Sequence, residues 1–284
     1  MTDPTRSTIR RIMQMRQAAI SIPGIPPEIQ STRILPGFAH VLRRALSSSA
    51  LFAFNQVLRD RWVATQAAVL PAGSRVLDVG AGSCPYRALF AHCEYRAQDF
   101  AALQGEQLRH GGYGGIDYVC DATAIPVPDR SFDAVLCTEV LEHVPAPDAL
   151  IRELARVLRP GGRLMLSAPL GSGIHQEPYH FYGGYTPYWY RHFLAQAGFA
   201  EIRIEPNGGF FRHYAQESLR FLSMTRPFAR GMPGWLTLAF APLWLVLAVP
   251  LGLLMPVLGR WLDPFDREAR FTVGYHVTAL RQAG

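Results

Sequence analysis

The fold is decided by residues 76–85, Val-Leu-Asp-Val-Gly-Ala-Gly-Ser-Cys-Pro. The apolar start predicts a buried strand, and Asp78 near its end precedes a turn that contains Gly80 and Gly82. Glycine allows the backbone of such a turn to approach a ligand closely. We expect the next helix to begin near Pro85, with its free N–H groups facing the same cleft. A dinucleotide site would need a third glycine where Pro85 stands, which argues against a nicotinamide cofactor.

Strands and helices alternate after this turn. The apolar patterns predict strands at residues 75–79, 94–98, 116–120, 132–137, 163–167 and 199–204, and helices that lead up to Pro71 and that cover 149–158 and 187–198. This order predicts an α/β fold, with a mainly parallel sheet covered by helices on both faces. Ligands bind such sheets at the carboxyl ends of the strands, where the glycines and acids of this sequence lie.

Three carboxylates are expected at the ends of three successive strands: Asp78, Asp99 and Asp121. Asp99 follows Asp78 by 21 residues, and a carboxylate there can accept hydrogen bonds from both hydroxyls of a ribose. Asp121 with Ala122 suits the exocyclic amine and a ring nitrogen of a purine. Together the three acids predict a site for a nucleoside.

Further motifs follow the glycine turn in a specific order. They are 121–135, Asp-Ala-Thr-Ala-Ile-Pro-Val-Pro-Asp-Arg-Ser-Phe-Asp-Ala-Val; 139–144, Glu-Val-Leu-Glu-His-Val; and 156–162, Arg-Val-Leu-Arg-Pro-Gly-Gly. With these motifs, residues 74–205 resemble the class I S-adenosylmethionine-dependent methyltransferases of the type-eleven group. The resemblance implies a Rossmann-like sheet, mostly parallel with an antiparallel last strand, and S-adenosylmethionine as the cofactor. The sequence departs from the group at 111–115, where many members carry a longer helix.

The resemblance also implies which residues bind the cofactor. All of them lie at or just after the carboxyl ends of strands, and they are Asp78, Gly80, Gly82, Asp99, Asp121, Ala122, Thr138 and Glu139. Asp78, Gly80 and Gly82 would surround the methionine part of the cofactor, and Asp99 would bind the ribose. Asp121 and Ala122 would bind adenine. Thr138 and Glu139 would lie near the transferred methyl group.

A polar segment after the fifth strand is the candidate acceptor site. Residues 175–182, His-Gln-Glu-Pro-Tyr-His-Phe-Tyr, begin beside the expected methyl position. His175 or His180 would serve as a general base, because imidazole titrates near neutral pH. Tyr182 would face the sulfonium or line the acceptor pocket. The alternative is a lid that only packs against the next helix. The two histidines and Glu177 match no standard metal-site spacing, so no metal is expected.

A hydrophobic segment interrupts the pattern before its last strand, which is expected at 271–280. Trp235–Leu258 carries no charge and is long enough to span a bilayer, but Pro242, Pro250 and Pro256 interrupt it. Because the last strand belongs to the sheet, the chain must return to the same side of the membrane from which it entered. We therefore expect a broken helical hairpin that dips into one membrane leaflet, with a buried lid, a dimer contact or a true span as the alternatives.

Basic residues gather at the start of the chain. Residues 1–61 hold nine arginines against three acids, an excess that equals the net charge of +6 of the whole chain, which contains no lysine. The balanced remainder argues against a nucleic-acid partner, whereas the basic arm would attract anionic lipid. The start has no apolar signal segment and the four cysteines have no C-x-x-C spacing, which indicates a cytoplasmic protein. The exclusive use of arginine indicates a GC-rich, bacterial genome.

The sequence thus predicts a basic arm with a leading helix at 1–70, a cofactor-binding core at 71–225, an apolar membrane-associating or lid insert at 226–264, and the last strand at 265–284. The predicted function is methyl transfer from S-adenosylmethionine to a small-molecule or lipid-linked acceptor, a glycan included, at the inner face of the cell membrane. A quinone or another free lipid is the alternative acceptor. A non-catalytic, cofactor-binding assembly protein docked on the membrane is the alternative from another class. The oligomeric state is left open.

Overall fold

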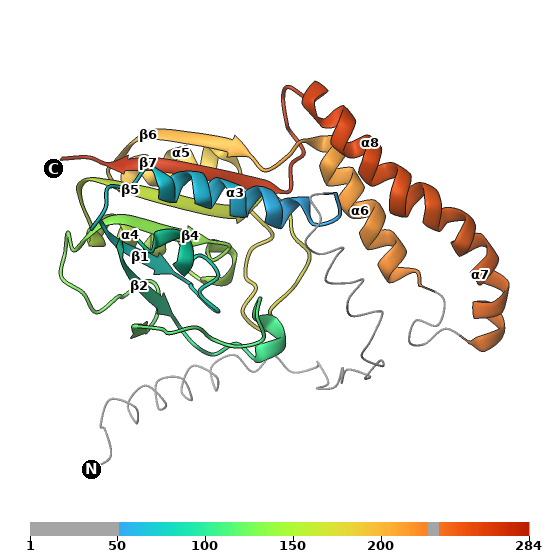
Figure 1. The fold of residues 1–284 in the computed structure, drawn as a ribbon, viewed down its shortest axis with the longest axis horizontal. Coiled ribbons are helices and arrows are strands. Elements are labelled where there is room, and N and C mark those ends of the chain that lie inside the picture. The colour runs from blue at the N-terminus through green and yellow to red at the C-terminus, as the bar shows by residue number, and fades with distance from the viewer. Residues whose placement is uncertain (1–50, 227–232, 284) are drawn as a thin grey trace, which may run out of the picture. The chain divides into compact units, whose positions relative to one another are not determined.

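The computed structural model describes residues 51–226 and 233–283, so the basic arm expected before the leading helix lies outside it. Within these ranges the structure has one seven-stranded sheet of order β3-β2-β1-β4-β5-β7-β6 (Figure 1). Its strands are β1 (Arg75–Val79), β2 (Glu94–Asp99), β3 (Tyr118–Val119), β4 (Phe132–Thr138), β5 (Leu158–Pro169), β6 (Phe199–Pro206) and β7 (Gly274–Arg281). Only β7 runs antiparallel to its neighbours β5 and β6. The expected mostly parallel sheet with an antiparallel last strand is confirmed.

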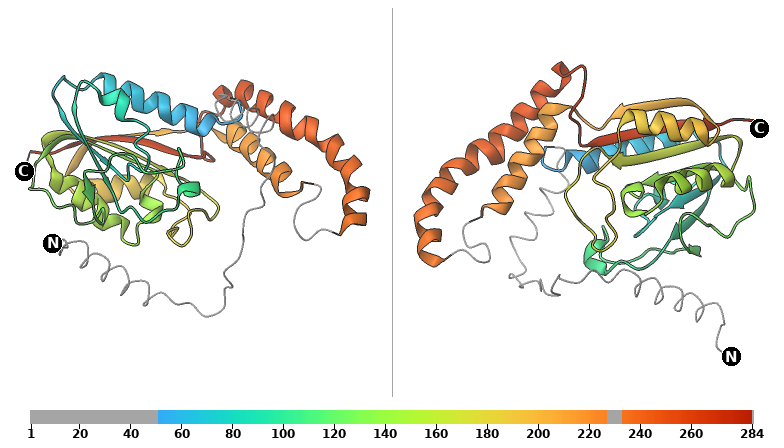
Figure 2. Two further views of the ribbon diagram at one scale, coloured as in Figure 1. Left: turned by 60° about the horizontal axis from the view of Figure 1, so that its bottom comes forward. Right: turned by 180° about the vertical axis from the view of Figure 1, so that it is seen from behind.

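Helices cover both faces of the sheet (Figure 2). Those around the sheet are α3 (Phe54–Ala68), α4 (Pro147–Val157) and α5 (Pro187–Gln196). Successive residues of a strand point to opposite faces. Accordingly, Val76 of β1 shares a buried cluster with Trp62 of α3, whereas Leu77 shares another with Leu150 of α4. The sheet is therefore buried on both sides, which explains why its strands are apolar runs rather than alternating patterns.

The register of the parallel strands brings the expected site residues to one edge. Asp78 of β1 lies opposite Ala97 of β2 and Leu136 of β4, and Asp99 at the end of β2 lies opposite Val119 of β3. The carboxyl ends of these four strands therefore form a common edge. The turn after β1, the end of β2 and the segment after β4 all meet there.

Two local predictions were wrong. The strand expected at 116–120 is reduced to the two residues of β3. The helix expected from Pro85 is only a short 3-10 turn, Arg87–Phe90. Cys84 has a left-handed backbone with φ +52°, and the residues between it and β2, which begins at Glu94, must also lead the chain back to the start of a parallel strand.

The apolar insert does not form the expected broken hairpin by itself. It is one long helix built from α7 (Gly234–Val249), a π-helical turn at Pro250–Leu254 and α8 (Met255–Leu262). Pro250 opens the π turn and Pro256 is the second residue of α8, so both prolines are accommodated without a reversal of the chain. The hairpin is completed by α6 (Phe210–Met224), which the sequence had assigned to the core. We call residues 210–265 without the undescribed 227–232 the helical arm.

Close contacts hold α6 against α8 (Figure 1). A Cβ added to Gly259 would lie 2.7 Å from the carbonyl oxygen of Phe211 and 2.9 Å from the Cβ of Ala215. The Ser218 hydroxyl donates to the carbonyl oxygen of Leu251 at 2.8 Å. At the base of the arm, the Asp263 carboxylate accepts hydrogen bonds from the backbone N–H groups of Gly209 and Arg212 at 3.0 and 3.1 Å. The end of α8 thus caps the start of α6, which closes the hairpin.

Replacing Gly259 with alanine should loosen this arm. The new methyl group meets backbone atoms that cannot give way, which costs on the order of 1–3 kcal/mol. Gly234→Ala is the matched control, because a Cβ there has no neighbour within 4 Å. Hydrogen exchange of α6 amides should be faster in Gly259→Ala and unchanged in Gly234→Ala. Equal exchange in the two variants would show that α6 and α8 are not in close contact.

Candidate active site

The turn after β1 has the backbone that its glycines suggested. Gly80 and Gly82 have φ angles of +71° and +52°, in the left-handed region that favours glycine, and a Cβ at Gly80 would overlap Val140. The backbone N–H groups of Gly80 and Ala81 donate to the carbonyl oxygen of Gln98 at 2.9 and 3.0 Å. The turn is therefore fixed to the end of β2.

Asp99 joins the same turn through its side chain. Its carboxylate is buried, with Oδ2 accepting a hydrogen bond from the Gly82 N–H at 2.9 Å and Oδ1 accepting one from Ala101 at 2.9 Å. Asp78, near the end of β1, is also buried, and its carboxylate accepts a hydrogen bond from the Tyr95 hydroxyl at 2.5 Å. Burial raises the pKa of Asp78 to about 7, and the charge of Asp99 adds to the rise. The structure thus brings Asp78, both glycines and Asp99 together.

The two residues expected to bind adenine, Asp121 and Ala122, differ in their exposure. Asp121 follows β3 at the same edge of the sheet, but it is exposed, and its Oδ1 accepts hydrogen bonds from the backbone and hydroxyl of Thr123 at 2.9 and 2.7 Å. Ala122 is buried. The glycine-rich segment 111–115 packs against the turn, since the Gly114 N–H donates to the Gly82 carbonyl at 2.9 Å. This short segment therefore lines the site beside the glycine turn.

The turn fits the cofactor that the sequence implied. The Ser83 hydroxyl, in the turn itself, is buried and has no hydrogen-bond partner among the described residues. A buried hydroxyl is costly to leave unpaired, so a bound polar ligand would complete this site. At Gly80 and Gly82 the missing Cβ atoms leave room for the side chains of Val140 and Leu108. The unpaired hydroxyl is the observation that suits a polar ligand such as a nucleoside with an amino-acid tail.

The end of β4 carries a charged network. Glu139 has a left-handed backbone with φ +54°. Its Oε1 accepts a hydrogen bond from the Ser167 hydroxyl at 2.7 Å, and its Oε2 pairs with the Arg59 guanidinium of α3 at 3.1 Å. The neighbouring Thr138 ends β4 and is half-buried. The leading helix therefore supplies Arg59, a site residue that sequence reasoning missed because it lies 80 residues before its partner.

The polar segment 175–182 covers this edge of the sheet. The Phe181 N–H donates to the carbonyl oxygen of Glu142 at 2.9 Å, which fixes the segment to the turn after β4. On its other side, the Gln176 side chain donates to the carbonyl oxygen of Gln107 at 3.0 Å, and the ring of Tyr179 meets that of Phe100 with centroids 5.0 Å apart. The segment therefore bridges the region after β4 to the region after β2. Its position suits a lid over the glycine turn.

Three imidazoles meet under this lid. The ring of His175 lies 4.6 Å from that of His180 and 4.8 Å from that of His143, between centroids. His143 Nδ1 lies 2.6 Å from the Tyr179 carbonyl oxygen, and His180 Nε2 lies 3.1 Å from the Ser172 hydroxyl. Burial lowers the pKa of His143 to about 4 and also lowers the pKa of His180. Tyr182 stands apart from this group, because its hydroxyl donates to the Pro145 carbonyl at 3.0 Å.

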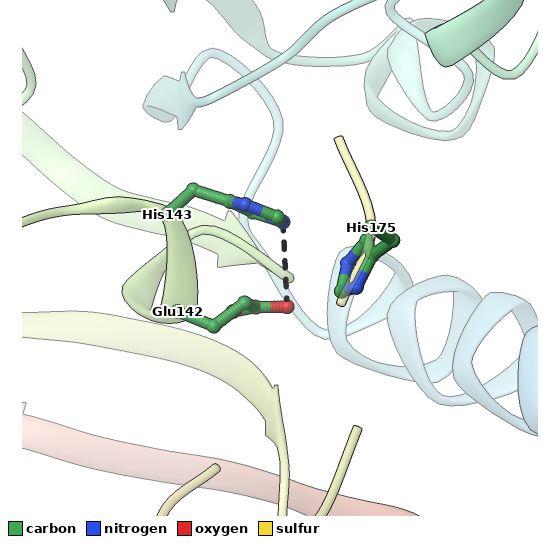
Figure 3. A group of neighbouring side chains, drawn as sticks. All are labelled: Glu142, His143 and His175. Carbon is green, nitrogen blue, oxygen red and sulfur yellow. Dashed lines mark ion pairs between the residues drawn. The ribbon is translucent and has the colours of Figure 1, made fainter. Parts of the chain in front are cut away.

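Glu142 is the second residue that sequence reasoning missed. Its side chain is 1% exposed, and neither carboxylate oxygen has a hydrogen-bond partner among the described residues. Its Oε1 lies 3.8 Å from Nε2 of His143 (Figure 3). Burial raises its pKa well above the ordinary value, and the charge of Glu139 raises it further. Glu142 and His143 belong to the quoted motif Glu-Val-Leu-Glu-His-Val, so the sequence did contain the signal.

The pKa of Asp78 predicts how stability depends on pH. The folded protein holds a proton there up to about pH 7, whereas the unfolded chain releases it near pH 4, so the wild type loses stability as pH rises between these values. Asp78→Asn removes this loss. The variant should be more stable than the wild type at pH 8, by on the order of 4 kcal/mol, and the difference should vanish near pH 4. Urea unfolding across this range measures it, and a difference that does not change with pH would refute the buried carboxylate.

Comparisons with known proteins agree with this geometry. A family model described as a methyltransferase domain matches residues 77–166. A ubiquinone biosynthesis O-methyltransferase from Xanthomonas oryzae is 41% identical over 103 residues, which are 34% of this chain and 43% of that protein. A demethylmenaquinone methyltransferase from Clavibacter sepedonicus is 40% identical over 110 residues, which are 37% of this chain and 45% of that protein.

The chain thus spans less than half the length of these curated relatives. The crystal structure of an S-adenosylmethionine-dependent methyltransferase from Archaeoglobus fulgidus aligns with a TM-score of 0.48 and 14% identity, over 86% of this chain and 100% of that one. The order of the seven strands, the glycine turn and the matched domain lead to one assignment. Residues 77–166 form a class I S-adenosylmethionine-dependent methyltransferase domain of the type-eleven family.

Proposed function

We propose that this protein transfers a methyl group from S-adenosylmethionine to a hydroxyl oxygen of a small acceptor with an apolar tail, at the surface of a membrane. The observation that carries the proposal is the meeting of the glycine turn with the Glu142 and histidine cluster at neighbouring strand ends, beneath one lid. The turn suits the methyl donor, and the cluster suits an acceptor that must lose a proton.

The residues at the strand ends divide the cofactor between them in this proposal. Asp78, Gly80 and Gly82 hold the methionine part, and Asp99 accepts hydrogen bonds from the ribose. The adenine lies beside Asp121 and Ala122, and Thr138 and Glu139 lie near the methyl group. When bound, the cofactor supplies a methyl group activated on a sulfonium. The fixed turn orients this group and the lid excludes water, and positioning of this kind can contribute up to about 7–11 kcal/mol to a rate enhancement.

The histidines supply the proton acceptor. A hydroxyl oxygen becomes a better nucleophile when its proton is removed. The lowered pKa values of His143 and His180 keep both imidazoles neutral near pH 7, so they are able to accept a proton. We propose His180 and His175 as the candidate bases, since they lie on the lid that meets the acceptor. We assign Tyr182 to the wall of the acceptor pocket rather than to proton transfer, since its hydroxyl is bound to a backbone carbonyl.

A quinone precursor is the acceptor that we favour. Two relatives in the comparison are named for ubiquinone and menaquinone biosynthesis, and quinone precursors carry both a ring oxygen and a long apolar tail. The lipid-linked glycan expected from the sequence is the other candidate. No contact among the described residues favours it over a quinone precursor.

The helical arm supports a role at the membrane. Residues 234–265 form one helix long and apolar enough to cross a bilayer by length and composition, and an 18-residue stretch within it has a mean hydropathy of 2.3. Leu238, Val246 and Val249 are 72%, 70% and 65% exposed. The accompanying α6 carries Glu217 and Arg220, which are exposed and paired with each other at 3.0 Å. Charges are costly at the centre of a bilayer, so we propose that the arm lies in the interface, with α7 toward lipid and α6 toward water.

Cofactor binding tests the first part of the proposal. Isothermal titration should show that the wild type binds S-adenosylmethionine and its demethylated product. Asp99→Asn should weaken both roughly 10- to 100-fold, because a charged hydrogen-bond acceptor contributes about 1.5–3 kcal/mol. Asp133→Asn is the matched control at the opposite edge of the sheet, where Asp133 pairs with Arg159, and it should bind like the wild type. Unchanged binding by Asp99→Asn would remove the ribose assignment.

Transfer of labelled methyl groups tests the acceptor. Tritium from the labelled cofactor should enter a quinone fraction of a bacterial lipid extract. Label found only in lipid-linked sugars would replace the quinone with the glycan. Cofactor binding without transfer to any fraction would favour the non-catalytic assembly protein.

Flotation with vesicles tests the membrane surface. Vesicles of phosphatidylethanolamine and phosphatidylglycerol should carry the wild type upward in a density gradient. The triple variant Leu238→Glu, Val246→Glu, Val249→Glu should stay at the bottom, because charge on the lipid-facing side opposes insertion. Val69→Glu changes an equally apolar residue, 59% exposed, outside the arm and should float normally. A wild type that stays at the bottom would remove the membrane role.

A further inference from the structure

An unpaired carboxylate lies in the interior at the end of β4. Glu142 is almost completely buried, and none of the described side chains forms a hydrogen bond to either of its oxygens. Arg59 is the nearby cation, but its guanidinium is paired with Glu139 at 3.1 Å. A buried carboxylate without a partner costs several kcal/mol if ionised and loses hydrogen bonds if protonated. Its surroundings therefore call for a cation that this part of the protein does not itself provide.

Two histidines present bare nitrogens beside this carboxylate. His143 Nδ1 lies 2.6 Å from the Tyr179 carbonyl, and His175 Nδ1 lies 2.9 Å from the Gly173 carbonyl. A carbonyl only accepts hydrogen bonds, so each Nδ1 carries the proton and each Nε2 keeps a free lone pair. Metal-binding histidines show this same pattern, in which one nitrogen donates to a carbonyl and the other binds the ion.

The three side chains converge from two parts of the chain. One ligand atom each from Glu142, His143 and His175 can be chosen so that all lie within 4.8 Å of one another. Figure 3 shows Glu142 and His143 side by side, with His175 facing them from a separate segment. Ligand atoms around a tetrahedral zinc ion lie roughly 3.3 Å apart, so binding requires a closure of roughly 1.5 Å. His175 is exposed on the lid and is the ligand free to make that movement.

We propose that Glu142, His143 and His175 bind one divalent transition-metal ion. Two imidazoles and one carboxylate favour zinc, cobalt or manganese over magnesium and calcium, which prefer oxygen ligands throughout. Three protein ligands leave at least one coordination position open. This site was not expected from the sequence, because His175 lies 32 residues beyond His143 and the tested spacing involved Glu177 instead.

The open position gives the ion a part in the proposed reaction. This role of the ion in methyl transfer rests on the proposed function. A hydroxyl oxygen of the acceptor that bound the ion would lose its proton more readily, and the proton would pass to water or to His180, because His175 would then be a metal ligand and no longer a candidate base. An acceptor with two adjacent oxygens would bind through both of them. The ion would therefore select acceptors with neighbouring hydroxyl groups.

Metal titration of the untagged, chelator-treated protein tests the site without any activity measurement. Cobalt should bind one ion per chain and give visible d–d bands, and zinc should abolish these bands by competition. Glu142→Gln and His143→Gln should each weaken zinc binding at least 10- to 100-fold, as measured against a chromophoric chelator. His192→Gln, which changes a histidine of α5 outside the cluster, should bind zinc like the wild type.

Thermal unfolding gives an independent measure that also shows whether the variants fold. Without metal, Glu142→Gln should unfold at or above the unfolding temperature of the wild type, because it replaces a buried carboxyl group that has no hydrogen-bond partner among the described residues with an uncharged side chain of the same size. Added zinc should raise the unfolding temperature of the wild type and leave that of Glu142→Gln unchanged. Failure of the wild type to bind zinc or cobalt, or equal zinc binding by the wild type and Glu142→Gln, overturns the site. Cofactor titration of the metal-free protein tests the proposed function separately, since Asp99 and the glycine turn contain no metal ligand.

Discussion

The structure depends on the hydrogen bond from the Gly82 N–H to the Asp99 carboxylate. This contact joins the turn after β1 to the end of β2 and holds the backbone of that turn in a conformation that favours glycine. The other oxygen of this carboxylate accepts a hydrogen bond from the Ala101 N–H, so Asp99 fixes the turn from the end of β2. Asp78, one strand away, shares the buried environment and accepts a hydrogen bond from Tyr95, but its pKa rises because it is buried.

A similar contrast distinguishes the two glutamates after β4. Glu139 is satisfied by Arg59 and Ser167, so its charge is compensated by the leading helix and by β5. Glu142 lies three residues further along, and neither of its oxygens has a hydrogen-bond partner among the described residues; the Nε2 atom of His143 lies 3.8 Å from Oε1. The two glutamates therefore differ in their surroundings. Glu139 faces α3, where Arg59 compensates its charge. Glu142 lies next to the lid and has no such partner among the described residues. An unpaired group at the acceptor side is typical of a site completed by a ligand.

The sequence predicted the features that are local in the chain and failed where distant segments meet. The apolar strands, the glycine turn and Asp99 follow from periodicity and from residues within one β-α unit, and the structure brings them together as expected. The helix expected at Pro85 is only one 3-10 turn, because the residues before β2 must also lead the chain back to the start of a parallel strand. Arg59, Glu142 and His175 were not recognised as partners, because their meeting depends on the packing of α3 and of the lid onto the sheet. The protonation of an imidazole also depends on a carbonyl elsewhere in the fold, which no spacing rule contains.

The path of the helical arm follows from the position of β7. This strand lies between β5 and β6, so the chain that leaves β6 must re-enter the sheet beside it. One long helix cannot meet that condition, but two antiparallel helices can. The hydrogen bonds from Gly209 and Arg212 to Asp263 join the two helices at the base of the arm. The apolar helix therefore needs the charged α6 as its antiparallel partner. Because α6 accompanies α7 and α8 with exposed charges, deep burial of the whole arm in lipid is disfavoured, and an interfacial position satisfies both helices.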